Sequence, residues 1–231
     1  MTFTPDVVYE TVLIVATALP RTFALDLVIL LATLPVATGF ALVEMKKIPV
    51  INHALQVLLS YQRGVPLLVH LFIAMITVPT VVASLARLIG APLERQDISP
   101  EAVVVIAFTA FQACIQSQNI RGAFHSVPPG QADAGRSMGF TRLQVVLRIT
   151  LPQAMTVLIP TIVTAFLRIF KGLSLAFTVG VVDVLAQARL TAALNYHYLE
   201  SYVAAALIYW LVCLLLQALA GHLELRTRYV H

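Results

Sequence analysis

Charge is the property that this 231-residue sequence has least of. Only 11% of its residues are Asp, Glu, Lys or Arg and 59% are apolar, whereas a soluble domain has about 25% charged residues. A soluble protein of this composition would need a very large core and almost no polar surface. The fifteen basic residues are spread thinly and form no dense patch, which argues against nucleic-acid binding. The sequence is therefore that of an integral membrane protein.

Cysteine is scarce as well, with two residues in the whole chain. Cys114 and Cys213 both lie in apolar stretches, so neither a disulfide framework nor a zinc site is supported. We expect no metal site in the chain.

Five apolar runs are long enough to cross a bilayer, which takes about 20 helical residues. They are 22–43, 64–86, 102–120, 149–167 and 201–221. Backbone polar groups must be satisfied inside lipid, and the runs do not alternate apolar and polar residues as barrel strands do. The predicted fold class is an all-α membrane protein with about five transmembrane helices. The one charge in the first run, Asp26, lies near its outer end and is expected to reach water.

Basic residues near the ends of the runs predict the orientation. The longest loop between runs, 121–148, is basic, and with the N-terminus outside Lys46, Lys47 and Arg63 also fall on the inner side. We therefore predict an N-outside, C-inside topology.

The two ends of the chain differ from the apolar runs. Residues 1–20 are acidic before their apolar stretch and lack the positive start of a signal peptide, so they are predicted to form an interfacial segment on the outer side. Residues 21–223 then form the membrane domain, and 224–231 form a short cytoplasmic tail.

The loop 121–148 contains signals for the start and stop of a helix. Pro128 and Pro129 suit a helix start, because proline lacks the amide that a first turn cannot use. Gly139 is expected to end this helix in the left-handed conformation, and Thr141 to cap the next one. The pattern predicts a short cytoplasmic helix between two turns, while a surface linker with some helical content fits it equally well.

Four short motifs resemble the permease subunits of bacterial ABC importers, in the branch for polar amino acids. That family's EAA loop reads roughly G-Q-x-E-A-A-x-x-L-G, with L-P-Q-A following, and is similar to Gly130-Gln131-Ala132-Asp133-Ala134-Gly135, Gly139 and Leu151-Pro152-Gln153-Ala154. The family's Y-x-x-x-R-G-T-P-L-L, R-G-G-x-x-S-V-P and K-D-T-S-L motifs are similar to Tyr61–Leu68, Arg121–Pro128 and Lys171–Leu175.

The sequence also departs from the family pattern. Asp133 replaces the usual glutamate of the loop, and Gly135 replaces an alanine. Gln118 stands where many members have glutamate, before the Arg-Gly pair. Gly172 and Leu173 replace the Asp-Thr of the last motif, which leaves the substrate's identity open.

The resemblance implies an ABC type-1 transmembrane domain without catalytic residues. It implies a second permease subunit in a homo- or heterodimer, two ABC ATPase subunits and an extracytoplasmic substrate-binding protein. No cofactor is expected in this chain, because ATP would be used by the partner subunits and the sequence has no G-x-x-x-x-G-K-[ST] phosphate loop. The resemblance assigns an ATPase-coupling loop to Gly130, Gln131, Asp133, Ala134, Gly139, Leu151 and Pro152.

Polar residues within two predicted spans are spaced three or four residues apart, which places each set on one helical face. The third span contains Gln112, Gln116 and Asn119, and the fourth contains Thr164, Arg168 and Lys171. With Ser174 of the K-D-T-S-L-like segment, we interpret them as a substrate pathway or gate. Hydrogen bonding between helices is the alternative for the first set.

Arg168 and Lys171 are like charges at membrane depth, where an ionisable group is costly and usually faces a cavity or a partner. An anion would relieve both. Asp183 and the α-carboxylate of an amino acid are the candidates, and a purely structural pairing stays open.

The leading hypothesis is the membrane-spanning permease subunit of an ATP-driven ABC importer for a polar amino acid or a related solute, in the bacterial inner (cytoplasmic) membrane. A permease for methionine or another small organic solute is the first alternative, because the five-span core is shared. A stand-alone channel or secondary carrier is the second, although carriers usually contain internal inverted repeats and none is visible here.

Overall fold

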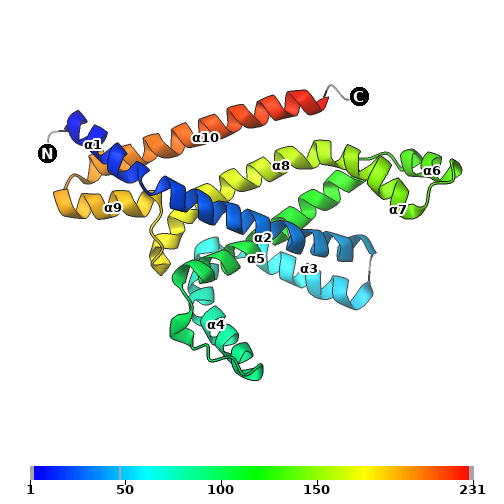
Figure 1. Cartoon of the computed structure of the whole chain (residues 1–231), viewed down its shortest axis with the longest axis horizontal. Coiled ribbons are helices and arrows are strands. Elements are labelled where there is room, and N and C mark those ends of the chain that lie inside the picture. The colour runs from blue at the N-terminus through cyan, green and yellow to red at the C-terminus, as the bar shows by residue number, and fades with distance from the viewer. Residues whose placement is uncertain (1–2, 47, 229–231) are drawn as a thin grey trace.

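The computed structural model describes residues 3–46 and 48–228, and of residues 222–228 it describes the backbone. The long helices of these parts are α2 (Leu19–Lys46), α4 (Leu67–Leu88), α5 (Pro100–His125), α8 (Leu151–Gly172) and α10 (Tyr198–Arg228). Shorter helices join them: α1 (Pro5–Ala16), α3 (Pro49–Gly64), η1 (Arg95–Asp97), α6 (Pro129–Ser137), α7 (Arg142–Val145), η2 (Val146–Thr150), η3 (Leu173–Val179) and α9 (Val184–Asn195) (Figure 1).

Five helical segments among the described residues are long and apolar enough to cross a membrane. They overlap the five predicted runs, and the fold class is confirmed. The fourth extends furthest beyond its run, over Arg142–Val179, because α7, a π-helical turn at η2, α8 and η3 follow one another without a break. The orientation in the membrane remains a prediction, and so does the division of the chain into segments 1–20, 21–223 and 224–231. α10 continues to Arg228, and Tyr229–His231 and Lys47 lie outside the described residues.

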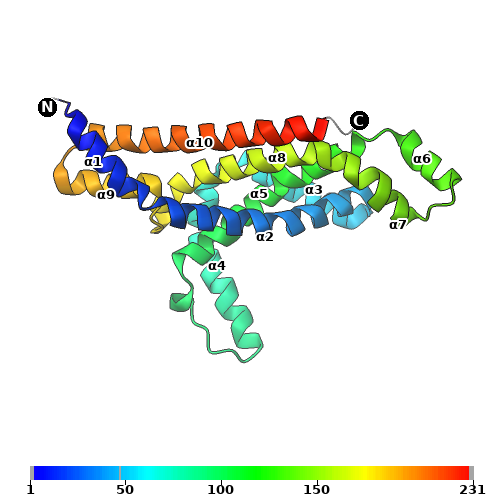
Figure 2. The ribbon, with the colours of Figure 1, turned by 45° about the horizontal axis from the view of Figure 1, so that its top comes forward.

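The core lies where α2, α5 and α8 run side by side (Figures 1 and 2). One cluster of fully buried side chains includes Ile29 of α2, Val103 in the first turn of α5 and Ile169 in the last turn of α8. Toward the end where α2 and α5 finish, small residues such as Ala37 and Ala113 take over. Small residues let membrane helices approach closely, where dispersion contacts rather than water exclusion drive their packing.

The segment after α2 is a helix rather than a loop. It forms α3, which turns back along α2 and buries Leu55 and Leu59 against Cys114 of α5. Sixteen residues of helix rise about 24 Å, so Arg63, near its far end, lies well away from the end of α2. The spacing of Leu55, Leu59 and the buried Gln62 is a helical signal that sequence analysis overlooked.

The chain changes direction between α3 and α4, at Gly64–Pro66. Proline cannot donate to a helix and restrains the residue before it, so the two helices are separate. α4 then leaves the bundle at a steep angle (Figures 1 and 2). His70, in its first turn, packs its ring 5.4 Å from that of Phe111, in the middle of α5. The break therefore lies at the level of the centre of the bundle.

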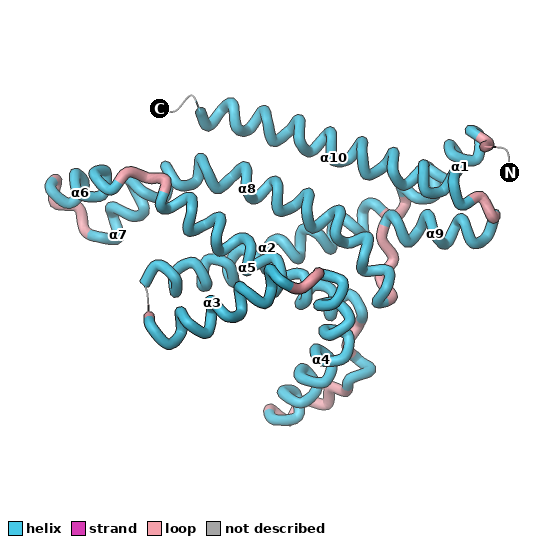
Figure 3. The backbone as a smooth tube through the Cα atoms, turned by 180° about the vertical axis from the view of Figure 1, so that it is seen from behind, coloured by secondary structure: helices cyan, strands magenta, loops and turns pink. Residues whose placement is uncertain are grey.

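The N-terminal segment forms a helix, α1, which packs against α9 and α10 at the end of the bundle opposite α6 (Figures 1 and 3). Asp26, in the second turn of α2, does not reach water as predicted. Its side chain is fully buried and neither carboxylate oxygen has a hydrogen-bond partner among the described residues. Nearness to a helix end indicated exposure, but the packing of neighbouring helices decided otherwise.

Candidate functional site

The loop between α5 and α8 has the local structure that the sequence predicts. α6 begins at Pro129, and Gly139 adopts the left-handed conformation with a φ of 85°. The Thr141 hydroxyl caps α7 by accepting from the Gln144 amide at 3.3 Å, while the Gln144 side chain accepts from the Thr141 amide at 2.8 Å. This reciprocal capping box fixes the start of the next helix. The short helix between two turns, rather than a linker, is confirmed.

α6 packs against α7 and η2 of the same chain through Gly135. A Cβ built on this buried glycine would lie 2.5 Å from the Cδ1 of Ile149 and 3.2 Å from the Cγ2 of Val145. The alanine of the family pattern would therefore require these side chains to move. The small residue serves packing inside the chain at this position.

The remaining loop residues face outward at one end of the molecule (Figures 2 and 3). The predicted coupling residues of α6 are all exposed, namely Gly130, Gln131, Asp133 and Ala134, and Gly139 after it is exposed too. Asp133 forms an ion pair with Arg136 one turn later. Pro152 is exposed and Leu151 half-buried where α8 begins. The seven predicted coupling residues thus share one end of the bundle.

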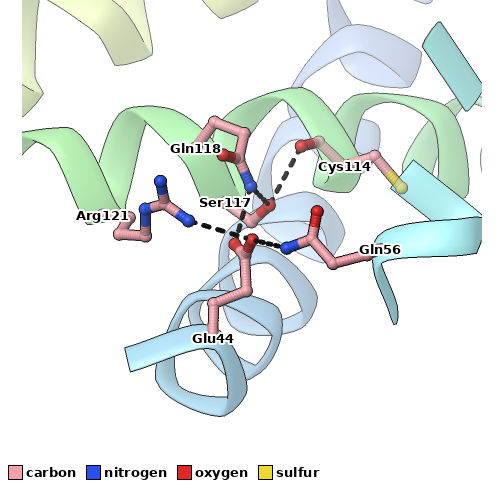
Figure 4. Close-up of polar contacts among 6 residues, drawn as sticks. All are labelled: Glu44, Gln56, Cys114, Ser117, Gln118 and Arg121. Atoms are coloured by element: carbon pink, nitrogen blue, oxygen red, sulfur yellow. Dashed lines mark hydrogen bonds and ion pairs between the residues drawn. The ribbon is translucent and has the colours of Figure 1, made fainter. Parts of the chain in front are cut away.

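A buried carboxylate close to this end was missed by sequence analysis. Glu44, in the last turn of α2, has a side chain only 1% exposed. It accepts from Gln56 of α3 at 2.7 Å, from Gln118 of α5 at 2.6 Å and from Arg121 of α5 at 3.2 Å (Figure 4). Gln118, where family members often have glutamate, is here a donor to a carboxylate that α2 supplies. The sequence feature that could have identified Glu44 is its place as a glutamate at the end of an apolar run.

A cavity of about 480 Å³ lies between α8 and α10. Its lining includes three residues predicted for the substrate pathway, Thr164, Arg168 and Lys171. The α10 side contributes Gln217, Ala220 and Gly221. Arg168 and Lys171 are exposed, and neither forms an ion pair with a side chain that the structure describes.

Asp183 is not the partner of these two cations. Its carboxylate is 99% buried at the start of α9, where it accepts from the amides of Ala186 at 2.9 Å and Leu185 at 3.3 Å. The Tyr209 hydroxyl donates to the same carboxylate at 2.6 Å. Three donors thus occupy Asp183, and it forms no ion pair with Arg168 or Lys171.

The other predicted pathway residues lie apart from this cavity. Gln112 and Gln116 are buried in α5, and Gln116 accepts from Asn119 at 2.7 Å within the same helix. The Nε2 atoms of both glutamines have no partner among the described residues. Ser174 lines a second cavity of about 340 Å³, together with Lys171 and Tyr209. Their assignment to a pathway remains a prediction.

These features describe a multi-pass helical membrane protein with a structured helix, α6, outside the bundle. Residues 29–229 match the family of binding-protein-dependent transport system inner membrane components, and the chain belongs to this family. The family that the four motifs resemble is thereby confirmed.

Relatives and solved structures agree with this assignment. The chain is 31% identical over 207 residues to the probable amino-acid permease YxeN of Bacillus subtilis, covering 90% of this chain and 88% of that protein. It is 35% identical over 192 residues to the L-cystine transport system permease TcyB of the same organism, covering 82% and 76%.

Two solved structures share the fold. The crystal structure of an amino acid ABC transporter with histidines superposes with a TM-score of 0.80 at 23% identity, over 98% of this chain and 100% of that one. The MetNI methionine ABC transporter gives a TM-score of 0.68 at 15% identity, over 93% and 96%. The likeness establishes the ABC transmembrane fold.

Proposed function

We propose that this chain is the membrane subunit of an ATP-driven importer for an amino acid or a related solute, in the bacterial cytoplasmic membrane. The observation that supports the proposal most is the cavity between α8 and α10, where Arg168 and Lys171 form no ion pair with a side chain that the structure describes. An amino acid brings a carboxylate for them. The amino-acid permeases among the relatives support the same substrate class.

Coupling would pass through α6 and the residues around it. In this proposal two ATPase subunits bind the exposed face of α6, a second permease subunit completes the pathway, and an extracytoplasmic protein delivers the substrate. ATP is hydrolysed in the ATPases, and Asp133, Ala134 and Gly139 act mechanically. Family membership favours this importer over a stand-alone channel or carrier.

The test is reconstitution of the chain with the ABC ATPase and the binding protein that we expect its neighbouring genes to encode. Proteoliposomes with ATP in the lumen, where the ATPase subunits face inward, should accumulate a radiolabelled amino acid. Proteoliposomes with a non-hydrolysable ATP analogue in the lumen should not. Equal uptake in both would indicate a channel or carrier. ATP-driven uptake of other small solutes alone would exclude amino acids as substrates.

A further inference from the structure

We infer that the cavity between α8 and α10 is built for an amino acid whose side chain carries a carboxylate in addition to the α-carboxylate. The inference rests on the proposed function, because it names the substrate class of the same site.

The cavity contains two positive charges and no countercharge. No Asp or Glu is among its lining residues in the part of the chain that the structure describes. The Thr164 hydroxyl donates to the Pro160 carbonyl at 3.0 Å, within its own helix. Gln217 lines the cavity on the α10 side, and its side-chain amide oxygen can accept from an ammonium group.

Among the side chains that the structure describes, the neighbouring positions do not supply an acid. Asp183 is occupied by two amides and the Tyr209 hydroxyl. At Gly172, a Cβ would lie 3.1 Å from the Cε1 of Phe108 and 3.6 Å from the Cδ2 of Leu67. An acidic side chain there would start in a packed contact, and Phe108 would have to move. The charge of the cavity is thus left for its ligand to balance.

Charge balance then selects the ligand. Arg168 and Lys171 are three residues apart on one helical face, so they repel each other, and an anionic ligand that enters the cavity relieves this repulsion. A single α-carboxylate leaves one positive charge uncompensated. A dicarboxylic amino acid supplies two carboxylates, and its ammonium group meets the Gln217 amide oxygen. A cationic side chain would add a further positive charge and is disfavoured.

Direct binding to the membrane complex tests this inference without the binding protein, which has a selectivity of its own. The full-length chain and its ATPases, in nanodiscs, are titrated with L-glutamate, L-glutamine and L-arginine by calorimetry. Glutamine has nearly the shape of glutamate but lacks its charge. One added charge-assisted contact typically strengthens binding about tenfold or more, so glutamate should bind at least that much tighter than glutamine, with arginine weakest. Arginine or glutamine binding as tightly as glutamate, or no saturable binding of any of the three, would overturn the inference.

A nearly isosteric variant locates the effect. Gln217→Glu places a carboxylate opposite the two cations and should lower glutamate affinity about tenfold and abolish its advantage over glutamine. Gln96→Glu, the same change in the exposed η1, is the matched control and should retain wild-type selectivity. Unchanged selectivity in a folded Gln217→Glu variant contradicts the inference.

Failure of the inference and failure of the proposed function give different results. If arginine binds best and is taken up with ATP, the substrate class is wrong and the importer function stands. If no amino acid is taken up with ATP, the proposed function itself fails.

Discussion

The carboxylate of Glu44 in α2 accepts a hydrogen bond from the guanidinium of Arg121 in α5 at 3.2 Å. At the opposite ends of the same two helices, Arg21 of α2 forms an ion pair with Glu101 of α5. α2 and α5 therefore run parallel and are joined by ion pairs near both ends. α2 supplies the acid in one pair and the base in the other. Glu44 also joins α3 through Gln56, just before α5 leads into the loop that contains α6.

We expect Glu44→Ala to destabilise the protein strongly. It leaves a guanidinium and two amides without their acceptor, and removing one partner of a buried ion pair typically costs about 3–5 kcal/mol. Because Arg121 is 41% exposed, the lower end of that range is expected. The thermal unfolding midpoint of the purified protein measures the loss.

Moving the acid tests whether the charge itself matters. Gln118 lies three residues before Arg121 on α5, so Glu44→Gln with Gln118→Glu returns a carboxylate to the guanidinium from the same helix. This double variant should be more stable than Glu44→Gln alone. Gln118→Glu alone should be destabilised, because two carboxylates then face one guanidinium. A double variant no better than Glu44→Gln would show that the carboxylate must come from α2.

Gly139→Val should abolish ATP-driven uptake while the protein stays in the membrane. A β-branched residue is strained at a φ of 85°, and the turn after α6 would change shape. Gly90 is the matched control, because it has a φ of 73° and open space around a Cβ but lies in the loop after α4. Gly90→Val should keep its uptake. Normal uptake by Gly139→Val in proteoliposomes would remove this glycine from coupling.

Cysteine labelling tests the N-outside, C-inside prediction. A cysteine placed in the 91–100 loop should react with an impermeant thiol reagent from outside, and Ser137→Cys in α6 should react from inside. Background should be low, because Cys114 is buried and Cys213 is half-buried in α10. The opposite labelling pattern would invert the topology.

Lys171→Ala should transport poorly yet assemble and retain basal ATPase activity, because a ligand contact is lost. A charge-assisted contact is typically worth about 1.5–3 kcal/mol, or roughly ten- to a hundredfold in affinity. Since Asp183 already has three donors, the Lys171→Ala/Asp183→Ala double variant should not recover. Tyr209→Phe removes one of those donors and serves as the control for damage at Asp183. Uptake restored in the double variant would mean that the lysine only neutralises the aspartate.

Features that depend on neighbours along the chain were predictable. Uninterrupted apolar runs are a condition for a helix in lipid, so the five spans follow from composition and length. The start of α6 at Pro129, the left-handed Gly139 and the Thr141 cap depend on the backbone chemistry of a few adjacent residues. These local rules act on residues that are close in sequence, which makes them visible in it.

Features that depend on residues far apart in the chain required the tertiary structure. The helical spacing of Leu55 and Leu59 was present in the sequence, but that this face of α3 packs against α2 and α5 was visible only in the fold. Asp183 was a candidate partner for Lys171 until the fold brought Tyr209 to it, and Asp26 became buried although it lies near a helix end. Glu44 meets Arg121 across 77 residues of sequence. The sequence by itself determined the number and type of the membrane helices and the local structure of the loop between α5 and α8. Which charges are paired and which face a cavity was decided only by packing, because burial and hydrogen bonding depend on helices that are distant in the chain.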